Sequence, residues 1–268
     1  MKNAGFEKQK KRTAQRKVRK SFLAVVLVFI ISVLLILCMT VLFPVKKIEV
    51  SYSGERYTKK EIISSSGITV GENIFMLSGG DTADKVTKSL PYIGELEVKK
   101  EFPDTVKLIA KETSRRYCLP YGKHYVILDD NFKVLEKTKE YVKAATCVNG
   151  ISISRAELGE TVVFKSDEQR MQLKKICKGL KKHSISVQYV DFKTPSDIKI
   201  YADKKFTVLL GTASDMDDKL NFLYKMIPQI KKKDKKDKGT INLGYFGSKK
   251  EGYFTSGEFK LTYFDEEK

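Results

Sequence analysis

The sequence predicts an α+β protein that has one membrane-spanning helix and two small domains outside the membrane. An apolar run lies near the N-terminus, a β-α-α-β-β order of hydrophobic patterns follows it, and a longer mixture of strand and helix patterns completes the chain. We therefore expect five segments: a basic cytoplasmic tail at 1–21, the membrane helix at 22–43, a first domain at 44–113, a second domain at 114–246 and a variable C-terminal tail at 247–268.

The apolar run extends from Phe22 to Phe43 and contains no charged residue. A helix of this length is about 33 Å long, which is enough to cross a hydrocarbon core of roughly 30 Å. A cleaved signal peptide has a shorter apolar core followed by small residues, whereas Pro44 and Val45 follow here. The run is therefore predicted to be a membrane anchor.

The charges on the two sides of this run predict its orientation. Residues 1–20 carry a net charge of +8, while Lys46 and Lys47 are the nearby cations on the other side. Because cytoplasmic flanks carry the excess of Lys and Arg, we expect a single-pass type II protein with its N-terminus in the cytoplasm. Beside a membrane helix, such a basic tail is expected to contact anionic lipid rather than nucleic acid.

Charge and cysteine content indicate the surroundings of the part of the chain outside the membrane and the state of its thiols. The whole chain has a formal net charge of +18, so this part keeps about +10, which suits an anionic setting such as lipid headgroups or wall polymer. Cys118, Cys147 and Cys177 are widely spaced and show no zinc-binding pattern. We expect buried free thiols, with one disulfide as the alternative.

The first domain begins with a strand at Val45–Ser51. Thr58 and Glu61 have the spacing of a capping box, and Gly67 is placed to end the short helix that they start. The remaining elements of this domain are a helix at Asp81–Leu90, capped by Asp81, and two alternating strands at 96–99 and 105–110 around a turn at 102–104.

The second domain mixes strands with two amphipathic helices. Leu173, Ile176 and Leu180 follow helical spacing in the first of these helices. The expected helices are 167–182 and 215–230, and the expected strands are 117–120, 125–128, 132–135, 146–150, 185–192, 198–201, 207–210 and 240–246. A Lys-rich loop at 231–238 and a polar tail with a further candidate strand at 259–264 complete the chain.

Patterns of catalytic residues are missing from the sequence. His124 and His183 are its only histidines, and no HExxH, GxSxG or Walker pattern occurs. Asp129 and Asp130 are adjacent and are better explained as a hairpin turn than as paired carboxylates. We therefore expect a non-enzymatic protein with no metal, no cofactor, no small-molecule substrate and no nucleic-acid partner.

The last expected strand of the second domain, Thr240–Phe246, is the candidate partner-binding site. At a sheet edge its backbone groups would pair with a strand of a partner, and its aromatic residues would anchor that partner. The alternative is an ordinary strand that the chain's own tail covers. The candidate residues are Ile241, Asn242, Leu243, Gly244, Tyr245 and Phe246.

Several short motifs, weak one by one, occur in an order that is characteristic of a known family. They are 45–50 (VKKIEV), 57–62 (YTKKEI), 71–75 (GENIF), 90–93 (LPYI), 102–106 (FPDTV), 125–129 (YVILD), 157–160 (ELGE) and 210–211 (LG). With this order over nearly its whole length, the chain resembles the bacterial division proteins FtsQ and DivIB, and more closely the Gram-positive DivIB branch.

This resemblance implies a POTRA domain at 44–113, a β domain at 114–246 that ends in an edge strand, and a non-enzymatic role in the division machinery. It implies binding of FtsB/DivIC-like and FtsL-like proteins outside the membrane, regulation or stabilisation of septal peptidoglycan synthesis, and enrichment at the septum; the septal peptidoglycan synthase is a further candidate partner. In the family, the partner adds a strand at the position of Ile241–Tyr245. Asn242 and Gly244 replace the Asp and Arg that are usual there.

Two other functions compete with this one. A membrane-anchored wall-active enzyme would need a carboxylate pair, or a nucleophile and a base, in one cleft. An extracytoplasmic sensor would need an output domain in the cytoplasm, and a tail of about 20 residues leaves no room for one.

Overall fold

The computed structural model describes residues 23, 25–34, 39, 42–142, 144–192, 196–233, 238–247 and 250–257. The predicted tail at 1–21 and the candidate strand at 259–264 lie outside these residues, and the predicted membrane helix and Lys-rich loop lie partly outside them. The chain divides into two compact units. Unit 1 contains residues 1–86 and 96–111, and unit 2 contains residues 87–95 and 112–268.

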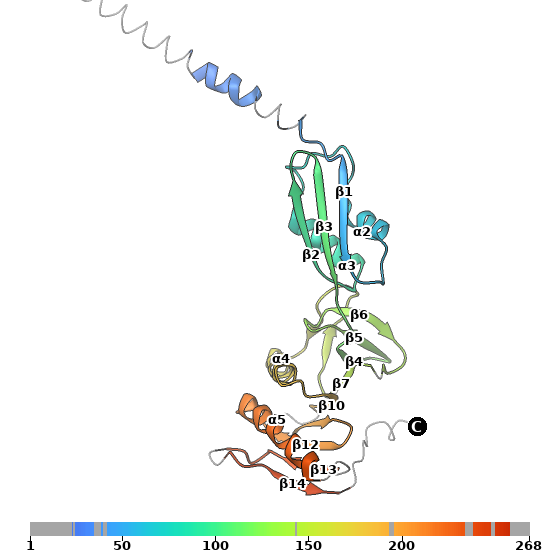
Figure 1. Cartoon of the computed structure of the whole chain (residues 1–268), viewed down its shortest axis with the longest axis vertical. Helices are drawn as coiled ribbons and strands as arrows, with labels where there is room; N and C mark the ends of the chain where they lie inside the picture. The colour runs from blue at the N-terminus through green and yellow to red at the C-terminus, as the bar shows by residue number, and fades with distance from the viewer. Residues whose placement is uncertain are drawn as a thin grey trace, which may run out of the picture. The chain divides into compact units, whose positions relative to one another are not determined.

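Residues 25–34 are helical and are drawn in blue in Figure 1. Their described side chains are mostly exposed. Among the helices that the structure describes, none is both long enough and apolar enough to cross a bilayer.

The elements that follow appear in the predicted β-α-α-β-β order: β1 (Lys47–Ser53), α2 (Lys59–Ser66), α3 (Gly79–Ser89), β2 (Ile93–Glu101) and β3 (Thr105–Glu112). The three strands form one sheet in the order β1-β3-β2, and β1 runs parallel to β3, as the adjacent arrows in Figure 1 show. The buried side chains of unit 1 include Ile62 of α2 and Leu108 of β3.

Helix boundaries in this region follow from local hydrogen bonds. The capping box is confirmed: the Glu61 amide donates to the Thr58 hydroxyl at 3.2 Å, and the Thr58 amide donates to the Glu61 carboxylate at 2.7 Å. Gly67, with φ 71°, ends this helix. The prediction that Asp81 caps α3 is wrong, because the helix begins at Gly79 and the Asp81 amide donates to the Ser78 hydroxyl at 3.3 Å.

Unit 2 contains a sheet of nine strands in the order β14-β13-β12-β11-β10-β7-β4-β5-β6. Its strands are β4 (Tyr117–Tyr121), β5 (His124–Leu128), β6 (Val134–Thr138), β7 (Thr146–Asn149), β10 (Val187–Asp191), β11 (Ile198–Ala202), β12 (Phe206–Gly211), β13 (Gly239–Asn242) and β14 (Tyr253–Ser256). The helices are α4 (Asp167–Lys182) and α5 (Met216–Lys233). The sequence did not predict the small pair β8 (Ile153–Arg155) and β9 (Val163–Phe164), nor β14.

The main core of unit 2 lies between this sheet and the apolar stripes of α4 and α5. Leu173 and Ile176 of α4 and Leu223 of α5 are fully buried against strand residues such as Val208 and Ile241. Residues on the opposite face form smaller clusters, one of which contains Cys118 and Ile127. Alternation along each strand sends side chains to opposite faces, which explains why neighbouring residues belong to different clusters.

The three described cysteines, Cys118, Cys147 and Cys177, are buried free thiols, as the sequence predicted. Cys118 of β4 and Cys147 of β7 are register partners in a parallel pair of strands. Burial raises the pKa of each of the three thiols, and that of Cys177 rises from 9.0 to about 12. These thiols are therefore protonated in the folded chain at neutral pH.

We expect these thiols to destabilise unit 2 at high pH. The unfolded Cys177 thiol loses its proton near pH 9 while the folded one keeps it up to about pH 12, so stability is full below pH 9 and falls as the pH rises through that window. The slope is about 1.4 kcal/mol per pH unit for each such thiol. Urea unfolding between pH 8 and 10.5 measures it, and Cys177→Ala should have a shallower slope; equal slopes would contradict the assignment.

Candidate partner-binding surface at the C-terminal strands

The predicted strand Thr240–Phe246 is shorter in the structure and does not lie at the edge of the sheet. It corresponds to β13, which ends at Asn242. β12 pairs with it in parallel on one side, and β14 pairs with it antiparallel on the other. Of the two alternatives for this strand, the second therefore holds: a segment from the C-terminal tail covers it, as Figure 1 shows for the β13–β14 pair.

Most of the six candidate residues face the protein itself. Ile241 and Leu243 are fully buried and Phe246 is 2% exposed, so these three side chains belong to the core. The Asn242 carboxamide oxygen accepts the Gly244 amide at 2.9 Å and so closes a turn. Tyr245 is the exception, since it is 85% exposed.

The chain around this turn is held by close backbone packing with the end of β12. The Leu243 amide donates to the Leu209 carbonyl at 2.8 Å. Gly211 has φ 65°, and a Cβ placed there would lie 2.9 Å from the Gly244 Cα. The buried Lys219 ammonium of α5 donates to the Leu210 carbonyl at 2.7 Å, and burial lowers its pKa. The Leu210-Gly211 motif therefore has a structural role.

Among the described residues, β14 is the outermost strand at this end of the sheet. The Gly257 amide donates to the Lys238 carbonyl at 3.0 Å, next to the pair Gly239–Ser256. Because hydrogen-bonded and non-hydrogen-bonded pairs alternate in an antiparallel ladder, the backbone of Phe254 points away from β13. This direction is the one from which a further strand would pair.

The two faces of β14 differ. Phe254 packs on Phe206 of β12, with ring centroids 6.1 Å apart, and so joins the core. Tyr253 is 60% exposed and lies opposite Asn242 of β13. Tyr245, which is also exposed, follows Asn242 by three residues in the chain. One end of the β13–β14 ladder therefore carries two exposed tyrosines.

Glycines allow β14 to lie this close to its neighbours. A Cβ on Gly239 would lie 2.1 Å from the Thr255 carbonyl oxygen, and one on Gly252 would lie 2.5 Å from a methyl carbon of Leu243. β14 lies within residues 247–268, which the sequence predicted to be a variable tail. The signals that were present are these glycines and the alternating Tyr-Phe-Thr-Ser segment at 253–256.

Comparison with known proteins agrees with the motifs. Residues 43–112 match the family described as the FtsQ-type POTRA domain. DivIB cell division proteins from two Clostridium botulinum strains are each 28% identical to the chain over 240 residues, which cover 87% of this chain and 91% of the relative. The DivIB protein of Clostridium acetobutylicum is 27% identical over 224 residues, 81% of this chain and 86% of the relative.

The resemblance to the FtsQ/DivIB family is confirmed. The structure is also similar to the major extracytoplasmic domain of the trans isomer of DivIB from Geobacillus stearothermophilus, with 15% identity, a TM-score of 0.28 and coverage of 46% of this chain and 97% of that one.

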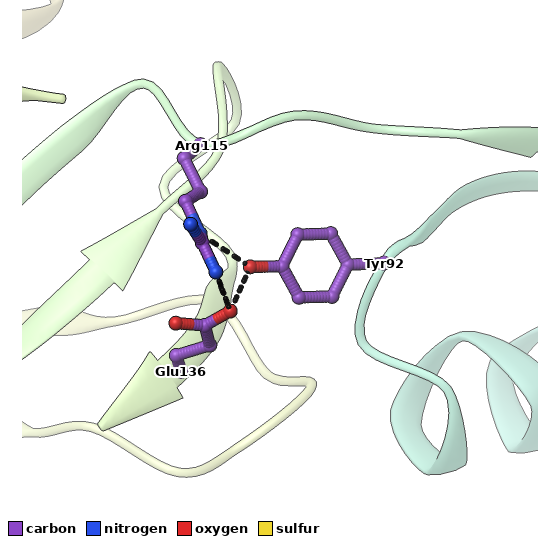
Figure 2. Close-up of polar contacts among 3 residues, drawn as sticks. All are labelled: Tyr92, Arg115 and Glu136. Atoms are coloured by element: carbon purple, nitrogen blue, oxygen red, sulfur yellow. Dashed lines mark hydrogen bonds and ion pairs between the residues drawn. The ribbon is translucent and has the colours of Figure 1, made fainter. Parts of the chain in front are cut away.

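One of the motifs on which the resemblance rests lies in a polar cluster within unit 2. Tyr92, from the Leu90–Ile93 motif, donates through its hydroxyl to Glu136 of β6. Arg115 donates to the Tyr92 hydroxyl at 2.8 Å and to the Glu136 carboxylate at 2.6 Å, as Figure 2 shows. Burial raises the pKa of Tyr92, so its hydroxyl stays a donor at neutral pH.

Lys133 holds the same segment from another side. Its ammonium donates to the Thr87 carbonyl at 3.2 Å and to the Ile93 carbonyl at 2.6 Å, and burial lowers its pKa. These bonds satisfy carbonyl groups at and after the end of α3. Residues 87–95 are therefore bound to the rest of unit 2 by hydrogen bonds from charged groups, which are stronger than hydrogen bonds between neutral groups.

One cavity in unit 2 brings several titratable side chains together. It is lined by Tyr117, Asp130, Cys177 and Lys181, among others. Burial raises the pKa of both Tyr117 and Cys177, which keeps two potential nucleophiles protonated. Asp130 is paired with Lys181 at 2.7 Å. Within the described ranges, no three His, Cys, Asp or Glu residues are grouped as metal ligands.

The hairpin interpretation of Asp129 is confirmed. Its carboxylate is 2% exposed and accepts the amides of Asn131 at 2.8 Å and Lys133 at 3.0 Å. Asp and Asn side chains commonly close turns in this way. Asp129 therefore shapes the β5–β6 hairpin.

Proposed function

We propose that this chain is a non-enzymatic, membrane-anchored scaffold of the cell division machinery. It binds DivIC/FtsB-like and FtsL-like proteins outside the membrane and thereby stabilises or regulates septal peptidoglycan synthesis. The relatives over most of its length are named cell division proteins, which supports a division role. The apolar run at 22–43 and its basic flank support a single-pass type II topology.

The observation that carries the binding proposal is the outer edge of β14, with the exposed Tyr253 on β14 and the exposed Tyr245 after the end of β13. The backbone of β14 gives a partner strand hydrogen-bonding groups, which supply affinity in β-augmentation. Tyr245 and Tyr253 offer large, rigid side chains of the type that dominates binding energy at interfaces. Of the six candidate residues at 241–246, only Tyr245 is part of this proposed site.

The distribution of a fluorescent fusion in dividing cells tests the division role. A fusion of the full chain should form a band at midcell before constriction and should lose that band when the DivIC-like partner is depleted. A uniform membrane signal throughout the cell cycle would refute the division role, and a soluble signal would refute the anchor. An immunoblot for intact fusion protein excludes cleavage as the cause of either result.

A further inference from the structure

Unit 1 exposes a cluster of apolar side chains next to the C-terminal end of the apolar run. The rings of Phe43 and Phe75 have centroids 5.0 Å apart, and Phe102 lies 5.0 Å from Phe75 and 6.1 Å from Phe43. Phe75 is 41% exposed and Phe102 54% exposed. Val70 and Met76, in the same loop as Phe75, are 70% and 79% exposed.

These residues come from separate places in the sequence. Phe43 is the last residue of the apolar run, Val70, Phe75 and Met76 belong to the loop between α2 and α3, and Phe102 begins the turn between β2 and β3. Exposed apolar side chains that are gathered in this way usually mark an interaction site, whereas scattered ones do not. We call these five residues the aromatic cluster.

Hydrogen bonds tie this loop to the end of the apolar run. The Ile74 amide donates to the Phe43 carbonyl at 3.0 Å, and the Asn73 carboxamide donates to the Met39 carbonyl at 2.8 Å. Two residues after Phe43, the Val45 amide donates to the Glu72 carbonyl of the same loop at 2.8 Å. Wherever Phe43 lies relative to the bilayer, Phe75 therefore lies at nearly the same depth.

Charges around the aromatic cluster favour a membrane surface. The acidic Asp104 is paired with Lys46 at 3.3 Å, and the Glu72 carboxylate accepts the Thr69 amide at 3.3 Å. The Lys100 ammonium lies 3.5 Å from the Phe75 carbonyl oxygen. A lysine at the edge of an apolar patch can keep its ammonium among lipid headgroups while its methylenes cover apolar surface.

We propose that the aromatic cluster is a lipid-binding surface that seats unit 1 on the outer face of the membrane. The proposal rests on the predicted membrane helix at 22–43, which places Phe43 at the interface. The rings then lie ~5–10 Å deep, at the boundary between headgroups and acyl chains. The cluster thus holds unit 1 at the membrane surface.

A single tryptophan tests this seat, because the chain contains none. Met76→Trp places the probe in the aromatic cluster, and Met171→Trp is the matched control, since Met171 is also exposed, on α4 of unit 2. Each full-length variant is reconstituted into phosphatidylcholine vesicles that contain one quarter phosphatidylglycerol. Flotation on a density gradient shows separately whether the chain is anchored.

In vesicles, the probe at 76 should emit further to the blue than the probe at 171. Iodide should quench it at least about three-fold less, because that ion does not enter the headgroup–acyl boundary. A nitroxide on the lipid headgroup should quench the probe at 76 but not the one at 171. Phe75→Ser with Phe102→Ser should remove these differences while the chain still floats.

Three outcomes would overturn the proposal. Equal iodide quenching at 76 and 171 in a chain that floats would show that the cluster is in water. A blue shift that grows with the ratio of protein to lipid would assign the surface to a second copy of the chain. A chain that does not float would remove the anchor on which the seat depends. Partner binding by unit 2 is measured independently, so the proposed division role survives the first two results, and the third removes only its membrane anchor.

Discussion

Replacing Tyr245 and Tyr253 together with alanine should weaken binding of a DivIC/FtsL-like coiled-coil pair at least about 30-fold, because buried tyrosine anchors at an interface each contribute roughly 1–2 kcal/mol or more. Both side chains are exposed, at 85% and 60%, so the fold should be unaffected. Titration of the reconstituted full-length chain with the purified partner pair measures the dissociation constant.

Tyr224→Ala is the matched control for this experiment. Tyr224 is an exposed tyrosine of α5 in the same unit, with 49% exposure, and lies away from the C-terminal strand pair in sequence. Its removal should leave the dissociation constant within about two-fold of the original. If the double variant binds as tightly as Tyr224→Ala, the tyrosines at the end of β13–β14 are not the binding site.

Gly239→Ala provides a second arm that acts on β14 as a whole. The added Cβ would meet the Thr255 carbonyl oxygen, so β14 must move from its place beside β13. Binding through the outer edge of β14 should then weaken, whereas binding through an uncovered β13 would strengthen. Proline at Leu243 is a less informative change, because Leu243 is buried and its amide bonds to Leu209.

Gly159→Ala should destabilise unit 2 by about 2–4 kcal/mol, from left-handed backbone strain and a steric clash. Gly159 has φ 77°, and a Cβ there would lie 2.2 Å from the Lys88 carbonyl oxygen and 2.7 Å from its Cα. Its amide also bonds to the Val134 carbonyl at 2.8 Å, so the loop has little freedom to retreat. Reaction of the Cys177 thiol with a thiol reagent during a urea titration reports unfolding of this unit.

Gly122→Ala separates the effect of backbone strain from the effect of the steric clash. Gly122 has φ 63° in the β4–β5 turn, but a Cβ there would meet no atom within 4 Å. It should therefore cost only the strain of the left-handed backbone, about 1–2 kcal/mol. A loss in Gly159→Ala no greater than that in Gly122→Ala would mean that the approach of Gly159 to Lys88 does not occur.

Two of the motifs on which the resemblance rests make structural contacts around residues 87–95. Gly159 of the 157–160 motif and Tyr92 of the 90–93 motif both belong to the packing of this segment within unit 2. In the sequence, both motifs indicate only a resemblance to a family and predict no role for either residue. The structure assigns close backbone packing to Gly159 and a charged hydrogen-bond cluster to Tyr92.

Much of the secondary structure was predictable because it depends on neighbours in the chain. The capping box of Thr58 and Glu61 spans three residues, and the turn at Asp129 is closed by its own side chain. The helix at 167–182 was predicted with the boundaries that the structure gives it. Its stripe of Leu173, Ile176 and Leu180 follows from 3.6 residues per turn.

The candidate site was only partly predictable, because the sequence of a strand does not show which other strands pair with it. Ile241 and Leu243 have the same pattern in an edge strand and in a covered strand, since side chains alternate in both. The difference is made by β14, more than ten residues further along, whose pairing requires glycine at 239 and 252.

The sequence by itself determined the apolar run, its charged flank, the order of elements and the resemblance to the FtsQ/DivIB family, all of which are read from local patterns and their spacing. Only the tertiary structure decided that β14 covers β13, that Gly159 meets Lys88, and that Phe43, Phe75 and Phe102 share one surface. These contacts join segments that are far apart in the chain. Their free energy comes from packing and burial that no single segment contains.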